Sequence, residues 1–185
     1  MSEPQNMPGT VLSGRYQVDQ LRLESVGSSS GALHYDATDL SSLEAISVRI
    51  VALSQLIDPA LGSTTPDDAL AAFEQQFDIA SSLRHPCIES VLDHGEVTLE
   101  GERYVFVVGE RLAGGSLREF LDRGRRLTPS QALIVGIDVC RALDAAAKQG
   151  ISHSDLRPSR LVFGLDRRVR LVGFGAPLRP LDGLG

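Results

Sequence analysis

The sequence has little of what marks several large protein classes. It contains only two cysteines among its 185 residues, Cys87 and Cys140, and no CxxC pair, which argues against a disulfide framework or a zinc site. Lys and Arg number 18 against 24 Asp and Glu, so the net charge of -6 lacks the basic footprint of a general nucleic-acid binder. No apolar run approaches the roughly 20 residues that a membrane helix needs.

The N-terminus, MSEPQNMPGT, lacks the basic stretch and apolar run of a secretory signal. Hydrophobic residues make up 42% and charged residues 23% of the chain, which is typical of a globular protein with a buried core. We therefore expect a cytoplasmic chain, of one domain or two small lobes around a cleft, that binds neither nucleic acid nor membrane.

The first part of the chain has a strand-like pattern. Residues 1–12 contain prolines and few apolar anchors, which predicts a loose leader. Alternating Ile46, Val48 and Ile50 predict a half-buried strand with Ser47 and Arg49 on its other face. With similar segments before it, we expect an antiparallel meander over residues 16–23, 33–37 and 45–52.

A helix and two more strands follow. The run from Thr65 to Asp68 supplies a cap residue, a proline and early acids for a helix that ends at His85-Pro86. Two further strands are predicted at 88–92 and 104–108, joined through a turn at His94-Gly95.

The last third has a helical period. Ser116 with Glu119 predicts a capping box for a short helix, and Thr128 with Gln131 predicts one for a long helix over about 129–148. A hairpin is expected at 161–163 and 169–172. The long helix is expected to bury one apolar face, formed by Leu133, Ile137, Cys140 and Leu143.

Three segments, at these intervals, resemble the bacterial serine/threonine protein kinases. Residues 81–88 read SSLRHPCI, where the family has a leucine followed by HPNI, and residues 110–117, ERLAGGSL, resemble the family hinge. Residues 153–160 read HSDLRPSR beside the family pattern HRDLKPxN. Thirteen residues later Gly173 opens a GFG triplet where the family has DFG.

The resemblance implies an α+β fold of the bilobal protein-kinase type. It would have an N-lobe of antiparallel sheet with one helix, and a partial helical C-lobe. The expected parts are a flexible leader over 1–12, an N-lobe over 13–109, and the hinge with a partial C-lobe over 110–185. In the family the activation segment and the large helices follow this point, so we interpret the chain as a fragment. The alternative is a C-lobe that stops after its first long helix and hairpin, in which case the apolar face of the helix over 129–148 would need a partner.

The same resemblance implies the site residues. Asp155 matches the catalytic aspartate. Gly27 is the one glycine that matches the family's glycine-rich loop, and Arg49 stands where the family has the lysine of its third strand. Glu110 and Leu112 match the hinge that lines the nucleotide cleft. His153 is expected to brace the loop that carries Asp155.

Three positions depart from the family. Arg160 replaces the catalytic-loop asparagine and Gly173 the DFG aspartate, and these two are the family's magnesium ligands. Gln76 replaces the glutamate that pairs with the strand lysine. Magnesium needs oxygen ligands, which neither a guanidinium nor a hydrogen atom supplies. We therefore expect no metal site.

These departures predict a pseudokinase without enzymatic activity, a regulatory or scaffolding module that binds a protein partner. No cofactor is expected, ATP would bind weakly, and magnesium would not bind. The alternative is a fragment of a divergent kinase that binds ATP in a metal-poor manner, with Arg49, Arg157 and Arg160 neutralising the phosphates. In a third interpretation the chain is an interaction scaffold and its cleft has no role.

Overall fold

The computed structural model describes residues 7–22, 32–57, 59, 62–153 and 155–174 of the chain. The chain divides into two compact units. The first contains Met1–Phe73 and Val91–Arg111, and the second contains Glu74–Ser90 and Leu112–Gly185. The domain bounds expected from the sequence stay a prediction. Among the described residues, no helix is both long enough and apolar enough to cross a membrane.

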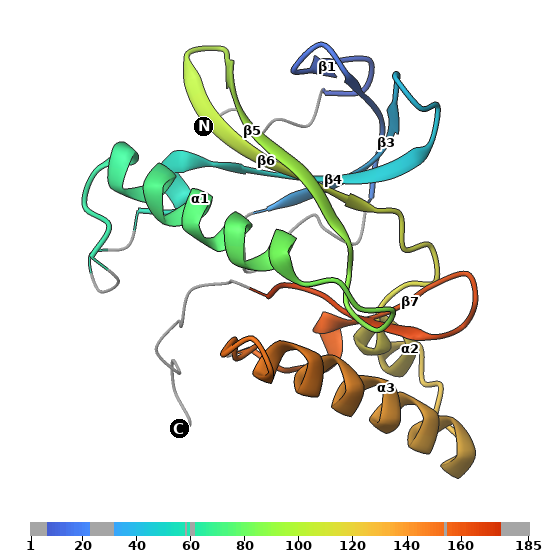
Figure 1. Ribbon diagram of the computed structural model, residues 1–185. Coiled ribbons are helices and arrows are strands. Elements are labelled where there is room, and N and C mark those ends of the chain that lie inside the picture. The colour runs from blue at the N-terminus through green and yellow to red at the C-terminus, as the bar shows by residue number, and fades with distance from the viewer. Residues whose placement is uncertain (1–6, 23–31, 58, 60–61, 154, 175–185) are drawn as a thin grey trace. The chain divides into compact units, whose positions relative to one another are not determined.

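A six-stranded antiparallel sheet forms the body of the first unit (Figure 1). Its order is β1-β2-β3-β4-β6-β5, so β2, β3 and β4 form the meander that the sequence predicts, and β1 adds a short strand that was not predicted. The strands are β1 (Val11–Leu12), β2 (Tyr16–Leu21), β3 (Leu33–Asp39), β4 (Ala45–Ala52), β5 (Val91–Leu99) and β6 (Glu102–Glu110).

Strand β4 shows why the sheet has a buried face. Ile46, Val48 and Ile50 are buried in the core of the first unit, while Ser47 and Arg49 on the other face are half-buried. Side chains of a strand point alternately to its two faces, so this pattern could be predicted from the sequence. The predicted strand and its two faces are confirmed.

The turn predicted at His94-Gly95 is wrong, because both residues lie inside strand β5. Gly95 pairs with Phe106 on β6, and a Cβ on Gly95 would lie 2.6 Å from the Phe106 ring. The glycine therefore admits an aromatic ring against the strand backbone, a role that glycine has in strands as well as in turns. The chain turns instead at Glu100 and Gly101, which have positive φ angles of 52° and 85°.

The described part of the N-terminal segment packs on the sheet. Met7 and Leu12 are only 2% and 0% exposed and belong to the core of the first unit, where the sequence predicts a loose leader over 1–12. Leu12 pairs with Tyr16 between β1 and β2. Two apolar side chains thus anchor this segment despite its prolines.

Helix α1 (Pro66–Ser82) begins where the sequence predicts and ends three residues before His85, where the predicted helix ends. Its first residues belong to the first unit, where Ala69, Leu70 and Phe73 pack with Leu53 and Val105. Its remaining residues belong to the second unit.

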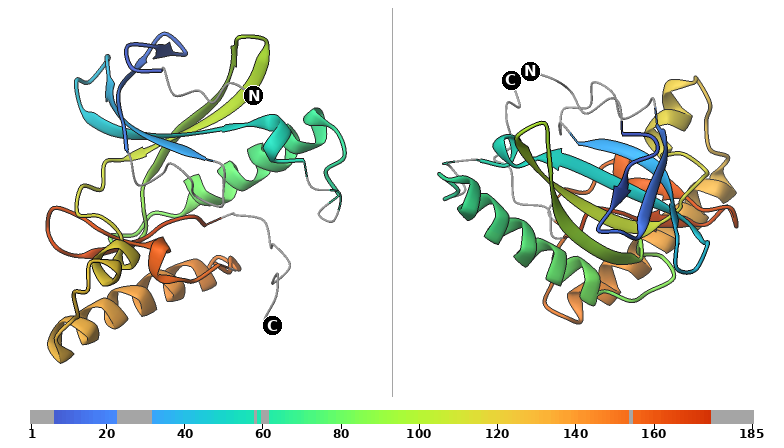
Figure 2. Two further views of the ribbon diagram at one scale, coloured as in Figure 1. Left: turned by 180° about the vertical axis from the view of Figure 1, so that it is seen from behind. Right: turned by 90° about the horizontal axis from the view of Figure 1, so that it is seen from above.

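The second unit contains two further helices, α2 (Leu117–Asp122) and α3 (Pro129–Ala147). After the short 3-10 helix η4 (Pro158–Arg160) come the paired strands β7 (Leu161–Phe163) and β8 (Val169–Leu171), and α3 packs against β8 (Figure 2). Both predicted capping boxes form, Ser116 with Glu119 and Thr128 with Gln131. The hairpin and both helix starts are thus confirmed.

The buried face predicted for α3 is wrong in most of its members. Leu133 and Ile137 are 66% and 42% exposed, and Cys140 is exposed as well. The face that packs into the second unit carries the fully buried Asp138 and Ala142 instead. Apolar residues recur on both faces of this helix, so the period alone did not identify the packed one.

Candidate functional site

The candidate residues of the first unit lie on its strands. Arg49 is half-buried on β4, between His34 of β3 and Val107 of β6 in the pairing. Glu110 ends β6, where its carbonyl accepts a hydrogen bond of 3.1 Å from the Ser47 hydroxyl. Gly27 lies outside the described residues. The candidate nucleotide-binding residues of this unit are thus held by backbone pairing.

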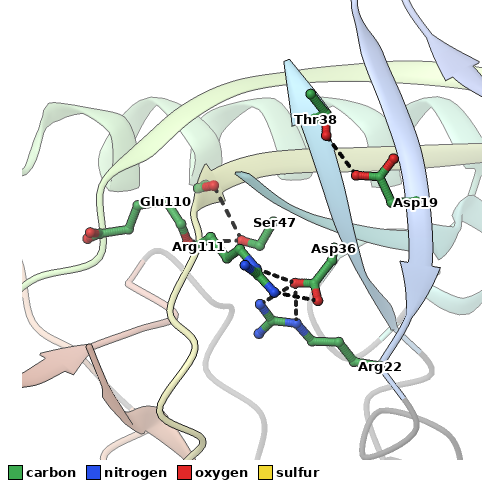
Figure 3. A network of polar contacts seen from close by, with 8 residues as sticks. Asp19, Arg22, Asp36, Thr38, Ser47, Glu110 and Arg111 are labelled. Carbon is green, nitrogen blue, oxygen red and sulfur yellow. Dashed lines mark hydrogen bonds and ion pairs between the residues drawn. The ribbon is translucent and has the colours of Figure 1, made fainter. Parts of the chain in front are cut away.

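The carboxylate of Asp36 joins two segments beside these strands (Figure 3). It accepts from Arg22 at 2.9 Å, just after β2, and from Arg111 at 3.1 Å, just after β6. Burial alone would raise the pKa of Asp36, but the two guanidinium groups hold it below its usual value. This network was missed at the sequence level, because oppositely charged residues 14 and 75 positions apart give no local signal.

The candidate residues of the second unit lie on the segment between α3 and β7. His153 is buried, its Nε2 lies 3.1 Å from the carbonyl oxygen of Val172, and its ring meets Phe174 edge-on at 4.6 Å. The N–H of Val172 donates to the carbonyl of Arg160 at 2.9 Å. The loop is therefore braced at both ends against the segment that follows β8 and carries Gly173, as expected for His153.

Two arginines hold the carboxylate of Asp155. Arg160 donates to Oδ2 from Nε at 2.9 Å and lies 2.8 Å from it through Nη2, while Nε of Arg157 lies 3.2 Å from Oδ1. Asp155 and Arg160 are partly exposed, with 32% and 24% of each side chain accessible, and Arg157 is half-exposed. The guanidinium groups thus fix the orientation of Asp155 and leave it within reach of solvent.

Gly173 leaves the space that the Arg160 side chain needs. A Cβ on Gly173 would lie 3.1 Å from Nη1 and 3.3 Å from Cζ of Arg160. The φ angle of Gly173 is +88°, a region that residues with a Cβ rarely adopt. The structure therefore brings together Asp155, Arg157, Arg160 and Gly173.

Two other candidate residues lie elsewhere in this unit. Leu112 is buried at 6% exposure, and Gln76 is half-buried on α1.

This side-chain set does not fit a magnesium ion. Asp155 is its one carboxylate, and two guanidinium groups already bind it. Within the described ranges, no group of three His, Cys, Asp or Glu residues is placed to hold a metal ion. Magnesium requires oxygen ligands in octahedral geometry, and a single carboxylate that is already paired with two arginines does not supply such a ligand set.

The comparison with known families decides the class of this fold. The family described as protein tyrosine and serine/threonine kinase matches residues 59–178, more than half of the chain. The chain belongs to the protein kinase family. The kinase-like α+β fold predicted from the sequence is thereby confirmed.

Bacterial serine/threonine kinases are among the similar proteins. A probable serine/threonine-protein kinase of Streptomyces coelicolor is 29% identical over 175 residues, which is 95% of this chain and 24% of that protein. Serine/threonine-protein kinase PknB of Mycobacterium tuberculosis is 26% identical over 164 residues, covering 89% of this chain and 24% of the relative. The chain thus spans about a quarter of the length of these curated kinases.

These relatives correct one prediction. The sequence led us to expect a chain without enzymatic activity, and that prediction is wrong: the kinase family matches most of the chain, and its bacterial relatives are named as serine/threonine-protein kinases. The family's two metal ligands are replaced at Arg160 and Gly173, and this replacement does not by itself amount to loss of the reaction.

Proposed function

We propose that this chain is part of a divergent serine/threonine protein kinase that binds ATP in an atypical, metal-poor manner. Membership of the kinase family and the bacterial serine/threonine kinases among its relatives support the reaction class. The observation that carries the proposal is Asp155, which keeps the family's catalytic carboxylate on a loop braced by His153 and oriented by Arg157 and Arg160.

In the proposed reaction a serine or threonine hydroxyl of a protein substrate attacks the γ-phosphorus of ATP. A bond from the hydroxyl oxygen to phosphorus forms, the bond from phosphorus to the bridging oxygen breaks, and ADP leaves. Asp155 accepts the hydroxyl proton. Phosphoryl transfer depends on positioning and charge stabilisation more than on covalent chemistry. The chain therefore needs an oriented carboxylate and a source of positive charge for the phosphates.

The nucleotide contacts belong to the same proposal. Arg49 on β4 would meet phosphate charge, and the backbone at Glu110 and Leu112 would receive the base. Gly27 would belong to the loop over the phosphates. The protein that carries the hydroxyl group is the expected partner, and the cytoplasm, where ATP is plentiful, is the proposed location.

Transfer of labelled γ-phosphate tests this proposal. The chain would be incubated with ATP and a serine/threonine peptide in EDTA, in magnesium and in manganese. Asp155→Asn should lower the rate of transfer by about 10² or more, because general-base catalysis contributes about 10² to 10⁴ in rate. Asp144→Asn is the matched control, since Asp144 is an exposed residue on α3 that pairs with Lys148. Transfer that Asp155→Asn leaves unchanged would contradict the assigned role.

A further inference from the structure

The departures at positions 160 and 173 form one structural change. In the family pattern an asparagine and an aspartate stand at these positions, and here they are arginine and glycine. The Arg160 guanidinium packs closely on residue 173, with Nη1 3.1 Å from the position of a Cβ. A side chain at position 173 would crowd this arginine and would also have to adopt a φ angle of +88°. The glycine therefore favours this placement of Arg160.

The exchange makes the loop more positive. The family pattern HRDLKPxN with DFG carries two aspartates, one arginine and one lysine, which sum to no net charge. Here Asp155 faces Arg157 and Arg160 with Gly173 beside them, which sum to one positive charge. The asparagine and aspartate of the family pattern offer oxygen donors to a divalent cation, whereas a net positive site attracts phosphate oxygens directly.

The hydrogen bonds of Arg160 leave donors for a ligand. Its Nε and Nη2 bind Asp155, while Nη1 makes neither of these bonds and faces Gly173. Arg157 contacts Asp155 through Nε and has 48% of its side chain exposed. Asp155 therefore cancels one of the two positive charges and orients both guanidinium planes. A preoriented guanidinium binds phosphate oxygens through paired N–H donors.

We propose that Arg160, seated against Gly173 and oriented by Asp155, is a metal-independent binding site for the polyphosphate chain of a nucleotide, with Arg157 as a second cation. This inference rests on the proposed function, since it names the source of positive charge in ATP binding. In this site the guanidinium of Arg160 would neutralise the charge of the phosphates, which in the family is neutralised by a divalent ion bound to the two ligand residues. The site lies wholly on the second unit.

Calorimetric titration with ATP in EDTA and in excess magnesium tests the inference on the unmodified chain. We expect ATP to bind in EDTA at least as tightly as in magnesium, because a bound divalent ion cancels the phosphate charge that Arg160 attracts. Inorganic tripolyphosphate should also bind in EDTA, since the site recognises the phosphate chain. An affinity for ATP that requires magnesium would overturn the inference.

Three variants locate the site. Arg160→Asn should weaken binding of ATP and of tripolyphosphate in EDTA by about ten- to a hundredfold, since a charge-assisted pair of hydrogen bonds is lost. The double variant R160N/G173D restores both family residues, and its ATP affinity should rise on addition of magnesium. Arg126→Asn, on an exposed arginine of the same unit, should bind as the unmodified chain does.

The two proposals fail in different ways. If ATP binds only with magnesium and Arg160→Asn binds equally well, Arg160 is not the phosphate site and the metal-poor mode of binding is overturned, while the phosphotransfer assigned to Asp155 stands. If ATP binds in neither condition, the proposed function is overturned, and tripolyphosphate then tests the site alone. Tripolyphosphate binding in EDTA that Arg160→Asn abolishes would support the anion site, and its absence would overturn it.

Discussion

Asp138 is a fully buried carboxylate in the middle of α3, and its partner Arg168 is half-exposed. Nε of Arg168 donates to Oδ2 at 2.8 Å, and the N–H of Val169 donates to the same oxygen at 3.4 Å. Burial alone would raise the pKa of Asp138, yet Arg168 and the backbone N–H hold it below its usual value. The charge therefore stays inside the second unit and fixes the β7–β8 hairpin against α3.

The two partners should differ in their contribution to stability. Asp138→Ala should lower the free energy of unfolding by about 2 kcal/mol, because it leaves the N–H of Val169 unpaired while Arg168 turns to water. Arg168→Ala should lower it further at pH 7, because it leaves a carboxylate buried without its cation.

Urea unfolding of both variants measures this difference. Arg141→Ala, on an exposed arginine of the same helix, serves as the control and should change the stability little. A larger loss in Asp138→Ala than in Arg168→Ala would contradict the account, since the pair would then be held by packing around the aspartate and not by charge.

At the scale of elements, the helix boundaries that depend on local chemistry could be predicted from the sequence. The features that depend on long-range packing could not. The caps at Ser116 and Thr128 depend on residues three positions away, so the sequence contains the whole signal. The need for a glycine at position 95 comes from the ring of Phe106 on the neighbouring strand. The residues next to Gly95 in the sequence do not indicate this contact. The Asp36 network escaped prediction for the same reason.

The candidate site divides in the same way. Asp155 could be located from the motif around it, because the motif is a local string. That Gly173 makes room for Arg160 required coordinates, since the sequence shows two departures and no contact between them. In the sequence alone the two departures resemble the loss of two metal ligands, which is why a chain without activity was incorrectly predicted.

Helix α3 allows a test of which face is packed. Leu133 is 66% exposed, whereas Leu143 packs against the core of the second unit. Leu133→Ala should change the free energy of unfolding by no more than about 0.5 kcal/mol, since no buried contact is lost and alanine favours the helix. Leu143→Ala should cost about 2 kcal/mol or more through lost burial and a cavity.

Urea unfolding compares these two variants directly. They are matched controls for each other, because both make the same chemical change on one helix. Equal losses would show that the face carrying Leu133 is packed as well, contrary to the structure.

At the scale of the whole molecule, stability rests on separate cores. The sheet of the first unit has its own buried cluster, and α3 with the β7–β8 hairpin forms another in the second unit. His153 is buried in the second unit beside Phe174, on the loop that carries Asp155. The protonation state of one ring therefore acts on a core and on the candidate site together.

Burial lowers the pKa of His153 below its usual value, and the nearby Arg160 contributes in the same direction. In this range of pH the unfolded chain binds a proton at His153 more readily than the folded chain does. The free energy of unfolding should therefore decrease as the pH falls from about 6.5 through the folded pKa of His153. The contacts agree with a neutral ring: Nε2 donates to Val172, and Nδ1 accepts from the N–H of Asp155 at 3.4 Å. If Nδ1 also carried a proton, its N–H would face the N–H of Asp155, and neither donor would have an acceptor.

Urea unfolding between pH 7.5 and 5.5 measures this cost. We expect the free energy of unfolding to fall over this range, and His153→Gln to flatten the fall, because a glutamine amide can donate to Val172 but gains no proton. The other histidines, His34, His85 and His94, are present in both proteins, so the difference between the two slopes belongs to His153. Identical slopes would mean that the buried ring takes up its proton as readily as in the unfolded chain, and the loop carrying Asp155 would then be insensitive to pH in this range.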